Sequence, residues 1–482
     1  MAKDFIVAIE LGSSKITGMA GKKNPDGSIT ILAAASEDST SYIRKGVVYS
    51  IDKTTQGLSN IISKLKNSLQ ADITQVYVGI GGQSIHSVKN MVIKDLPVDA
   101  IISQEMVNEL MDTNRNMTYQ DYEIQDAITE EYKVDLQYQT DPVGIQASRL
   151  EGNFLNILWR RSFYRNLNKS FDNAGIAIAE MYLAPIVMAG NVLTEAEKRA
   201  GCVLVDLGAE TTTVSVYYRD KLRSIDVIPL GGNNVTKDLE SLKMEEDEAE
   251  KMKIKYGSAL TDPVDIDPKA TLPIDSTRYV KNTDFIEVVE ARMLEIIENV
   301  KCFIPVEYTD KLLGGVVLTG GGSNMSNIEK AFREILGVEK VRVAKFVTLN
   351  IDTKESKPEL RHDGTMNTIL SLVARGDMNC AGNPFGNSLF DNPSIGTAAT
   401  TATTTAQTTP NVQTQSESKP ENVSRGYAAA TAAANAKPDK NDKEEQHENA
   451  KEQQDKRESP LHRWLGSLKQ FGRSILEPEN NE

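Results

Sequence analysis

Two short stretches of the chain each place a carboxylate, a glycine and small hydroxyl side chains at the end of an apolar strand. In FIVAIELGSSKIT, Glu10 precedes Gly12, and in CVLVDLGAETTTVSVY, Asp206 precedes Gly208 in the same way. Glycine lets the backbone turn without a Cβ clash, so that successive N–H groups can point at an anion. Serine and threonine hydroxyls can donate further hydrogen bonds to phosphate oxygens. A carboxylate at the end of a buried strand is well placed to hold a hydrated Mg²⁺.

The repetition of this pattern is more informative than either copy. One such hairpin could be an ordinary β-turn, whereas two indicate similar half-domains that face each other. Opposed hairpins would hold a nucleotide polyphosphate from both sides, which is the arrangement of the actin-like ATPases. The glycines and hydroxyl side chains that could bind phosphate are Gly12, Ser13, Ser14, Gly208, Thr211 and Thr212. Glu10 and Asp206 are the carboxylates that could hold Mg²⁺ through its water molecules.

Composition and charge argue against several classes of protein. The chain has 482 residues, enough for two or three domains, and its net charge of −14 argues against nucleic-acid binding over the whole surface. Cys202, Cys302 and Cys380 lack CxxC spacing, so we expect neither a disulfide framework nor a zinc site, and a reducing cytosol fits. The scattered histidines indicate no catalytic triad or metal site. No apolar run approaches the roughly 20 residues that cross a bilayer, and we expect no signal peptide.

Strand and helix patterns divide the chain into two related halves, each with a smaller unit inside it, and predict an α/β fold with mixed sheets. The expected units are a first lobe (1–83 and 161–200), an inserted α+β subdomain (84–160), a second lobe (201–230 and 305–375) and a small subdomain within it (231–304). In the insert, strand-like runs at 85–93, 143–150 and 155–159 surround a helix at 103–114. Two further predicted helices are one from Ala184 to about Arg199, with Pro185 in its first turn, and one at 324–336.

A sharp change of composition marks residues 376–460. Thr/Ala repeats, then Gln, Ser and Pro, then mixed charges give no apolar period. Such a segment cannot bury enough surface to offset its ordering, so we expect a flexible linker with a reach on the order of 50 Å.

The segment after this linker, LHRWLGSLKQFGRSIL at 461–476, has a helical apolar pattern. At 100° per residue its apolar side chains fall in one arc of roughly 140°, and its cations fall in the opposite arc. A helix of this kind, about 24 Å long, is typical of one that lies flat in a membrane interface. The alternative is a helix that docks on a core or in a partner groove. The apolar arc also contains Gly472, and the candidate membrane residues are Leu461, Trp464, Leu465, Leu468, Phe471, Ile475 and Leu476.

Two further motifs have weaker chemical signals. Gly320, Gly321 and Gly322 follow a buried strand and precede a helix, where their backbone could approach the sugar and α-phosphate of a nucleotide. Such turns are common, but this one comes third after two phosphate hairpins. Glu250 and Lys253 lie one helical turn apart, and by themselves they favour a solvated ion pair.

Taken together, these motifs resemble the FtsA family, actin-like bacterial cell-division proteins that tie the FtsZ ring to the membrane. The resemblance covers most of residues 5–375 and the terminal helix. It rests on IELGSSK (9–15), VYVGIGGQSI (76–85), LVDLGAETTTVSVY (204–217), PLGGNNVTKDL (229–239), AEKMKIKYG (249–257) and LTGGGS (318–323). Each motif alone is unspecific, whereas their combination with a tethered helix is specific. The resemblance implies a two-lobed actin-like (ribonuclease-H-like) fold with the family's small subdomain at 84–160.

The resemblance also implies roles for residues. Gly12, Ser13, Ser14 and Lys15 would match the first phosphate loop. The second would be matched by Asp206, Gly208, Ala209, Glu210, Thr211 and Thr212. Glu250 and Lys253 fall where actin-like proteins contact adenosine, and Gly320, Gly321 and Gly322 would line the ribose and adenine side. ATP and Mg²⁺ are the implied cofactors. The implied partners are the FtsZ C-terminal peptide (received at 231–304), further copies of the chain, the lipid membrane and other division proteins, with no nucleic acid. The implied location is peripheral, on the cytoplasmic side of the inner membrane at the division septum.

Two departures from the actin-like pattern affect hydrolysis more than binding. The first metal carboxylate is commonly Asp, and here it is Glu10. The second loop usually has two small residues after its glycine, and here it has Ala209 and Glu210. Glu210 adds negative charge near the γ-phosphate site unless it turns outward. We therefore expect ATP binding with slow turnover or none.

Other proteins with the same nucleotide clamp are the alternatives. A small-molecule kinase needs a positioned base between its lobes and gains nothing from a long tether. A heat-shock chaperone would carry a β-rich peptide-binding domain where this chain has its Thr/Ala-rich segment. A pilus-assembly scaffold would lack the terminal helix. The tethered amphipathic helix therefore favours a membrane-bound division scaffold.

Overall fold

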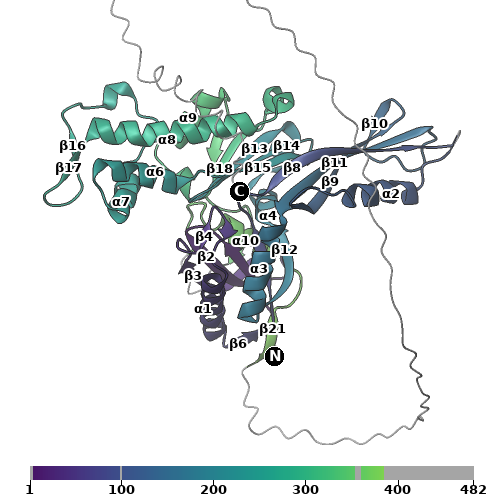
Figure 1. The fold of residues 1–482 in the computed structure, drawn as a ribbon, viewed down its shortest axis with the longest axis horizontal. Helices are drawn as coiled ribbons and strands as arrows, with labels where there is room; N and C mark the ends of the chain where they lie inside the picture. The colour runs from purple at the N-terminus through teal and green to yellow at the C-terminus, as the bar shows by residue number, and fades with distance from the viewer. Residues whose placement is uncertain (1–3, 98–99, 353–359, 385–482) are drawn as a thin grey trace, which may run out of the picture. The chain divides into compact units, whose positions relative to one another are not determined.

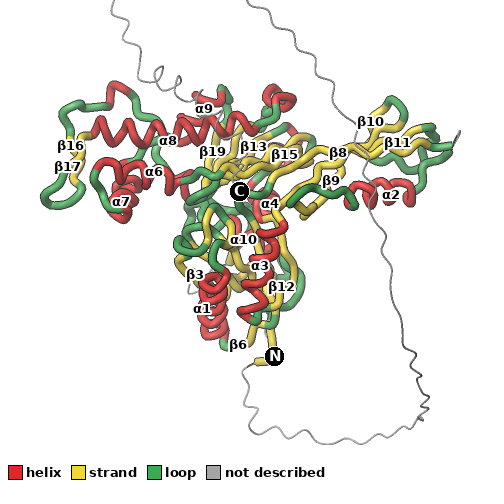
Figure 2. The backbone as a smooth tube through the Cα atoms, viewed as in Figure 1, coloured by secondary structure: helices red, strands yellow, loops and turns green. Residues whose placement is uncertain are grey.

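The computed structural model describes residues 4–97, 100–352 and 360–384. These residues belong to one compact unit, whose helices and strands are drawn in Figures 1 and 2. The predicted membrane helix at 461–476 and most of the predicted linker lie outside the described residues. Within the described ranges, no helix is long and apolar enough to cross a membrane.

Two sheets repeat one strand plan, as the twin hairpins predict. In each sheet, three consecutive antiparallel strands are followed by two parallel strands beside the first of them. In the first sheet these are β1 (Ile6–Leu11), β2 (Lys15–Lys23), β3 (Ile29–Asp38), β7 (Gln75–Ile80) and β12 (Ala177–Leu183). In the second they are β13 (Cys202–Leu207), β14 (Thr212–Tyr218), β15 (Lys221–Ile228), β18 (Gly315–Thr319) and β19 (Val341–Val343). The short β20 (Ile351–Asp352) extends the first sheet beside β3.

Strand β13 shows why these strands are apolar along their length. Val203 and Val205 face a core shared with α8 (Asn282–Phe303) and α9 (Ile328–Leu336), whereas Cys202 and Leu204 face the core of the first sheet. Successive residues of a strand point to opposite faces, so a sheet covered on both sides shows no polar alternation. Asp206, at the end of this buried strand, is therefore an exception that calls for a chemical reason.

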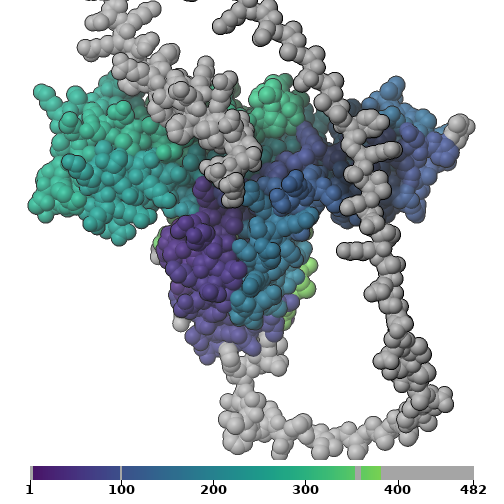
Figure 3. Space-filling model, in the orientation of Figure 1, coloured from purple at the N-terminus to yellow at the C-terminus, as the bar shows by residue number. Residues whose placement is uncertain are grey.

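The first sheet is covered by helices from widely separated parts of the chain. They are α1 (Ile51–Leu69), α3 (Arg161–Ala174), α4 (Ala184–Val192) and α10 (Asn367–Arg375). Leu58, Phe163, Met188 and Ile369, one from each helix, belong to the same hydrophobic core. Segments 4–83 and 161–200 thus pack together, as the purple and blue surfaces of Figure 3 show.

The insert has a hydrophobic core of its own, in which α2 (Gln104–Arg115) packs on β8 (His86–Asp95), β9 (Tyr122–Val134) and β11 (Arg149–Arg160). The small strand β10 (Gln137–Gln139) pairs with β9. Strand β8 also pairs with β15 where His86 meets Asp226, so the strands of the insert continue the second sheet. A buried ion pair between Arg223 Nη1 and Glu130 Oε1 (3.3 Å) reinforces this junction.

The sequence pattern did not predict β9, and it predicted two separate strands in the region of β11. The expected runs at 143–150 and 155–159 are replaced by one strand that crosses both, with residues 143–148 outside it. Strand β9 carries charged residues on both faces, and its pairing with β11 shifts register after Asn153 and Ile157. Each shift interrupts the simple two-residue alternation that identifies a strand.

The segment 231–304 packs around α8. Its elements are α6 (Gly232–Leu239), η1 (Glu240–Leu242), α7 (Glu246–Tyr256), η2 (Pro263–Asp265), the hairpin of β16 (Thr271–Pro273) and β17 (Tyr279–Lys281), and α8, followed by η3 (Val306–Lys311). Val235 and Leu239 from α6 and Phe285 and Val289 from α8 are buried in one core.

Two predicted helices have different limits in the structure. The helix expected at 184–199 is two helices, α4 and α5 (Glu195–Ala200), because Thr194 begins a new one. Its Oγ1 accepts from the Glu197 N–H (3.2 Å), while Glu197 accepts from the Thr194 N–H (2.8 Å), a capping box. The helix expected from 324 begins only at Ile328, after the 3₁₀ turn η4 (Gly321–Asn324).

Residues 376–384, which the sequence assigned to the linker, are instead part of the folded unit. Strand β21 (Ala381–Pro384) pairs with β6 (Ala71–Ile73), and the Cys380 N–H donates to the Phe5 carbonyl (2.8 Å). The Tyr77 hydroxyl donates to Asp377 Oδ1 (2.7 Å). Small and polar residues conceal this docking in the sequence, because its backbone partners lie some 300 residues away along the chain.

Truncation should distinguish this segment from the residues that follow it. Ending the chain after Gly376 is expected to lower the unfolding free energy by about 2 kcal/mol, because the buried Cys380 and the β6–β21 pairing are lost. Ending it after Pro384 keeps both and should leave the urea midpoint unchanged. Equal midpoints for the two truncated chains would contradict the structure.

Candidate phosphate and metal site

The two carboxylate hairpins have the same backbone geometry. Gly12 donates its N–H to the Lys15 carbonyl (3.0 Å), and Gly208 donates to the Thr211 carbonyl (2.8 Å). A Cβ on either glycine would lie within 2.9 Å of that same carbonyl oxygen, so a larger residue would open the turn. The need for glycine is therefore steric at both positions.

Glu10 and Asp206 occupy equivalent places, each in the fifth position of its six-residue strand. The pKa of Glu10 is raised to about 7, because burial and the negative charge of Asp206 outweigh the opposing effects of Lys15 and of a hydrogen bond with Thr368. Burial also raises the pKa of Asp206, to about 6. The two hairpins border a common region, because adjacent amides of Lys45 and Gly46 donate to Glu210 Oε2 of the second loop (2.6 Å) and to Ser13 Oγ of the first (2.8 Å).

This pair of carboxylates fits a hydrated Mg²⁺. Oxygen ligands are those that Mg²⁺ prefers, and it usually binds one or two carboxylates while it keeps several waters. A divalent cation would offset the repulsion that raises the pKa of Glu10. Glu10 and Asp206 would hold the ion, which would neutralise phosphate charge when bound.

The hydroxyl groups of the loops are not equivalent. Ser13 is buried and its Oγ accepts a hydrogen bond from the Gly46 N–H (2.8 Å), which leaves its own hydrogen available for a phosphate oxygen. Ser14 is exposed. Thr212 is buried and its Oγ1 donates to the Leu230 carbonyl (2.9 Å), so its hydrogen already stabilises the loop. Of the two threonines, Thr211 is therefore the better candidate donor to phosphate.

Glu210 turns toward the first half of the chain. Its Oε2 accepts the Lys45 N–H at 2.6 Å. The carbonyls of Gly208 and Ala209 accept the N–H groups of Gly232 (3.0 Å) and Asn233 (2.7 Å), which fixes the second loop on α6.

The three glycines after β18 pack against the second hairpin. Gly320 has a φ of +82°, a conformation that favours glycine, and a Cβ there would collide with the Asp206 carboxylate and lie 2.6 Å from the Leu207 carbonyl oxygen. A Cβ on Gly322 would also touch Leu207, whereas Gly321 has room. The need for glycine at Gly320 and Gly322 therefore comes from packing, which places this turn beside Asp206.

Glu250 and Lys253 form a network with α6. Lys253 Nζ donates to Glu250 Oε2 (2.6 Å), Thr236 Oγ1 (2.9 Å) and the Gly232 carbonyl (3.1 Å). Its side chain is 11% exposed, against 41% for Glu250. Lys253 is therefore a largely buried part of a hydrogen-bond network and not one member of a solvated ion pair. Gly232 connects this network to the second phosphate loop through its hydrogen bond to the Gly208 carbonyl.

Sequence reasoning missed several residues that border the site. Ser39 Oγ donates to the Gly12 carbonyl (2.6 Å), and Thr368 hydrogen-bonds to Glu10. Asn367 Nδ2 donates to Thr319 Oγ1 (2.9 Å), in the residue of β18 that pairs with Asp206, and its Oδ1 is buried without a partner among the described residues. These residues lie far from the hairpins in sequence, and no local pattern identifies them.

A family model described as "Cell division protein FtsA" matches residues 203–360, and one described as "SHS2 domain inserted in FTSA" matches residues 82–158. A relative from Porphyromonas gingivalis named cell division protein FtsA is 32% identical over 352 residues, covering 72% of this chain and 73% of its own length. One of the same name from Neisseria meningitidis is 30% identical over 335 residues, covering 67% and 80%.

A solved structure, the PilM-PilN type IV pilus biogenesis complex, has a similar fold. It superposes with a TM-score of 0.54 at 15% identity, covering 77% of this chain and 98% of that one.

Proposed function

The chain belongs to the FtsA family of cell division proteins, and on that premise we propose that it binds ATP with Mg²⁺ and tethers FtsZ filaments to the cytoplasmic face of the inner membrane. It is an actin-like cell division protein with an SHS2 domain inserted in its first half. This assignment argues against the small-molecule kinase and pilus-assembly alternatives. The observation that supports nucleotide binding best is the pair of equivalent hairpins, in which Glu10 and Asp206 are each followed by a glycine turn with the same hydrogen bond.

In this proposal, ATP binds between the two hairpins. The backbone N–H groups of the two turns and the hydroxyls of Ser13, Ser14 and Thr211 contact the phosphates, with Lys15 supplying positive charge. Glu250, Lys253 and the three glycines after β18 line the adenosine side. Binding of ATP to the full chain, measured by calorimetry with and without Mg²⁺, tests this directly. Absence of Mg²⁺-dependent binding would refute the nucleotide part of the proposal.

Hydrolysis is expected to be slow or absent. Glu10 stands where actin-like proteins commonly have Asp, and Glu210 adds a carboxylate to the second phosphate loop. An ATPase assay that finds several turnovers per second, abolished by Asp206→Ala, would overturn this expectation.

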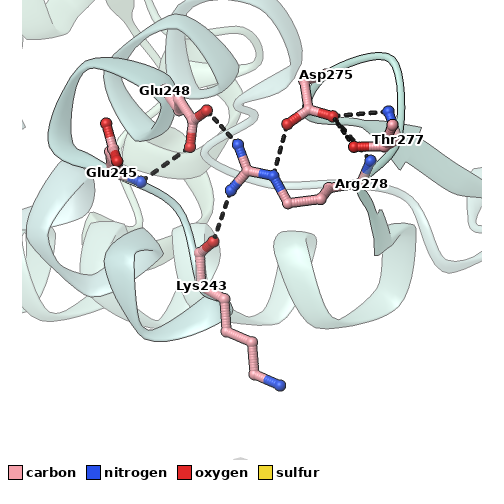
Figure 4. Close-up of polar contacts among 6 residues, drawn as sticks. All are labelled: Lys243, Glu245, Glu248, Asp275, Thr277 and Arg278. Atoms are coloured by element: carbon pink, nitrogen blue, oxygen red, sulfur yellow. Dashed lines mark hydrogen bonds and ion pairs between the residues drawn. The ribbon is translucent and has the colours of Figure 1, made fainter.

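The segment 231–304 is the proposed receptor for the FtsZ C-terminal peptide. Arg278, in the turn just before β17, contacts three groups on one side of this segment (Figure 4). It pairs with Glu248 on α7, its Nε donates to Asp275 Oδ2 (2.5 Å), and its Nη1 donates to the Lys243 carbonyl (3.3 Å). Asp275 Oδ1 also accepts the Thr277 N–H (2.7 Å), which closes the hairpin turn. Arg278 therefore holds the β16–β17 hairpin against α7.

Replacing Arg278 with Ala is expected to loosen this hairpin. Backbone amides at 271–281 should exchange with solvent several-fold faster, because one side chain supplies all three connections. Lys269→Ala removes an exposed cation from the same segment and is the matched control. If FtsZ-peptide affinity falls in Arg278→Ala but not in the control, the peptide depends on this side of the segment. Unchanged amide exchange would contradict the structural role of Arg278.

The proposed function also includes attachment to the membrane and association of several copies of the chain. The amphipathic segment at 461–476 would attach the protein peripherally, and one short helix binds a membrane only marginally. Copies that associate through their actin-like folds would bind many helices at once and so hold more firmly. Sedimentation with lipid vesicles, with and without ATP and an FtsZ C-terminal peptide, tests the complete function. Equal vesicle binding by a strictly monomeric variant would refute the coupling to assembly.

A further inference from the structure

A two-residue turn lies between the two phosphate loops. It connects β4 (Ile43–Arg44) and β5 (Val47–Val48) and consists of Lys45 and Gly46. The Gly46 N–H donates to Ser13 Oγ of the first loop (2.8 Å), and the Lys45 N–H donates to Glu210 Oε2 of the second loop (2.6 Å). Adjacent backbone amides of one turn therefore bond to both sides of the site.

The turn is held firmly on the first half of the chain. Lys45 has a φ of +49° and Gly46 a φ of +73°, as in the type I′ turn of a tight hairpin. The Lys45 carbonyl accepts the Gln83 N–H (3.0 Å), and a Cβ on Gly46 would lie 2.6 Å from the Gly82 Cα. The amide of Lys45 is therefore a fixed donor, whereas Glu210 reaches it from the second sheet through a flexible side chain.

We propose that Glu210 and the Lys45 amide form a clasp between the two halves that weakens when the bound nucleotide carries a γ-phosphate. This inference rests on the proposed binding of a nucleotide. Glu210 lies two residues after Gly208 in the second loop, so phosphate held by that loop brings negative charge close to its carboxylate. Like charges repel, and the side chain can relieve the repulsion by leaving Lys45. Glu210 thereby lowers the affinity for the triphosphate relative to the diphosphate. Binding of the triphosphate also weakens the hydrogen bond between Glu210 and the β4–β5 turn.

Substituting Glu210 separates its charge from its hydrogen bond. Glu210→Gln keeps a side-chain oxygen that can accept the Lys45 N–H, but removes the negative charge. A triphosphate should then bind about fivefold more tightly, as expected for the loss of one screened charge several ångströms away. A diphosphate should gain much less. Glu210→Ala removes the charge and the hydrogen bond together.

The experiment combines calorimetry with amide exchange on the full chain. Mg²⁺ complexes of ADP and of a non-hydrolysable ATP analogue are titrated into wild type, Glu210→Gln and Glu210→Ala. Glu334→Gln, the same charge change at an exposed position on α9, is the control. Exchange at the Lys45 amide is followed in each protein without nucleotide and with each nucleotide.

The outcomes distinguish a failure of the clasp from a failure of nucleotide binding. The clasp predicts faster Lys45 exchange in Glu210→Ala without any nucleotide, and in wild type faster exchange with the ATP analogue than with ADP. Tighter binding of the analogue, relative to ADP, in Glu210→Gln supports the charge effect. If both nucleotides bind but the ADP-to-analogue ratio is unchanged or reversed in Glu210→Gln, the clasp is refuted while the proposed function stands. If neither nucleotide binds wild type, the proposed function and the nucleotide dependence both fail.

Discussion

Glu10→Gln is expected to stabilise the nucleotide-free protein above pH 7 and to weaken its Mg²⁺-dependent nucleotide binding. The folded protein raises the pKa of Glu10 from 4.5 to about 7, so folding favours the protonated carboxyl. Stability from this group is fully present below pH 4.5 and is lost as the pH rises through about 7. The ionised carboxylate then costs on the order of 3 kcal/mol at pH 8, which the neutral amide avoids.

The same carboxylate is the reason that the site can bind a cation. Glutamine keeps the size of the side chain but supplies no charge to Mg²⁺, so nucleotide affinity in the presence of Mg²⁺ should fall at least about tenfold. Asp206→Asn should act in the same direction, over a window set by its pKa of about 6. In wild type, Mg²⁺-dependent binding should strengthen between pH 6 and 8 as both carboxylates ionise.

Thermal unfolding between pH 5 and 8, together with calorimetric titration, checks both halves of this prediction. The exposed Glu334→Gln controls for the change in net charge. A lower melting temperature for Glu10→Gln than for wild type at pH 8 would show that Glu10 stabilises the empty site. Undiminished Mg²⁺-dependent binding would remove Glu10 from the metal site.

Deleting residues 461–476 should move the protein from the membrane fraction to the soluble fraction. The apolar arc of this segment contains two aromatic and five aliphatic side chains besides Gly472, and the burial of such side chains in the interface supplies the binding energy. Trp464→Asp places a charge in the middle of this arc and should weaken vesicle binding at least about tenfold. Self-association would enlarge the difference, because each assembled copy contributes a helix.

Gln470→Asp is the matched control for Trp464→Asp. Gln470 lies in the polar arc, so the same added charge would face water rather than lipid. Vesicle co-sedimentation at fixed lipid composition should therefore retain Gln470→Asp and lose Trp464→Asp. Equal loss from both variants would indicate general charge repulsion by the membrane, and no loss from either would refute the interfacial helix.

Short-range patterns in the sequence were sufficient to identify the two hairpins and the family. Carboxylate, glycine and hydroxyl side chains recur at matching places in β1–β2 and β13–β14, and the structure gives both turns the same hydrogen bond. The apolar runs of β1, β7, β13 and β18 were equally clear, because strands buried on both faces cannot carry polar residues in their middle. These features depend on neighbours within a few residues, so the sequence alone reveals them.

Only the tertiary structure decided which of these groups meet. The repulsion between Glu10 and Asp206, the use of the Thr212 hydroxyl by Leu230 and the contact of Glu210 with Lys45 each join segments that no local pattern relates. The docking of residues 376–384 on β6 was concealed for the same reason, since backbone pairing requires no particular side chains. The sequence determined which side chains are present in each hairpin. Long-range packing determined which of these side chains contact one another, because the distance between two groups depends on every element that lies between them.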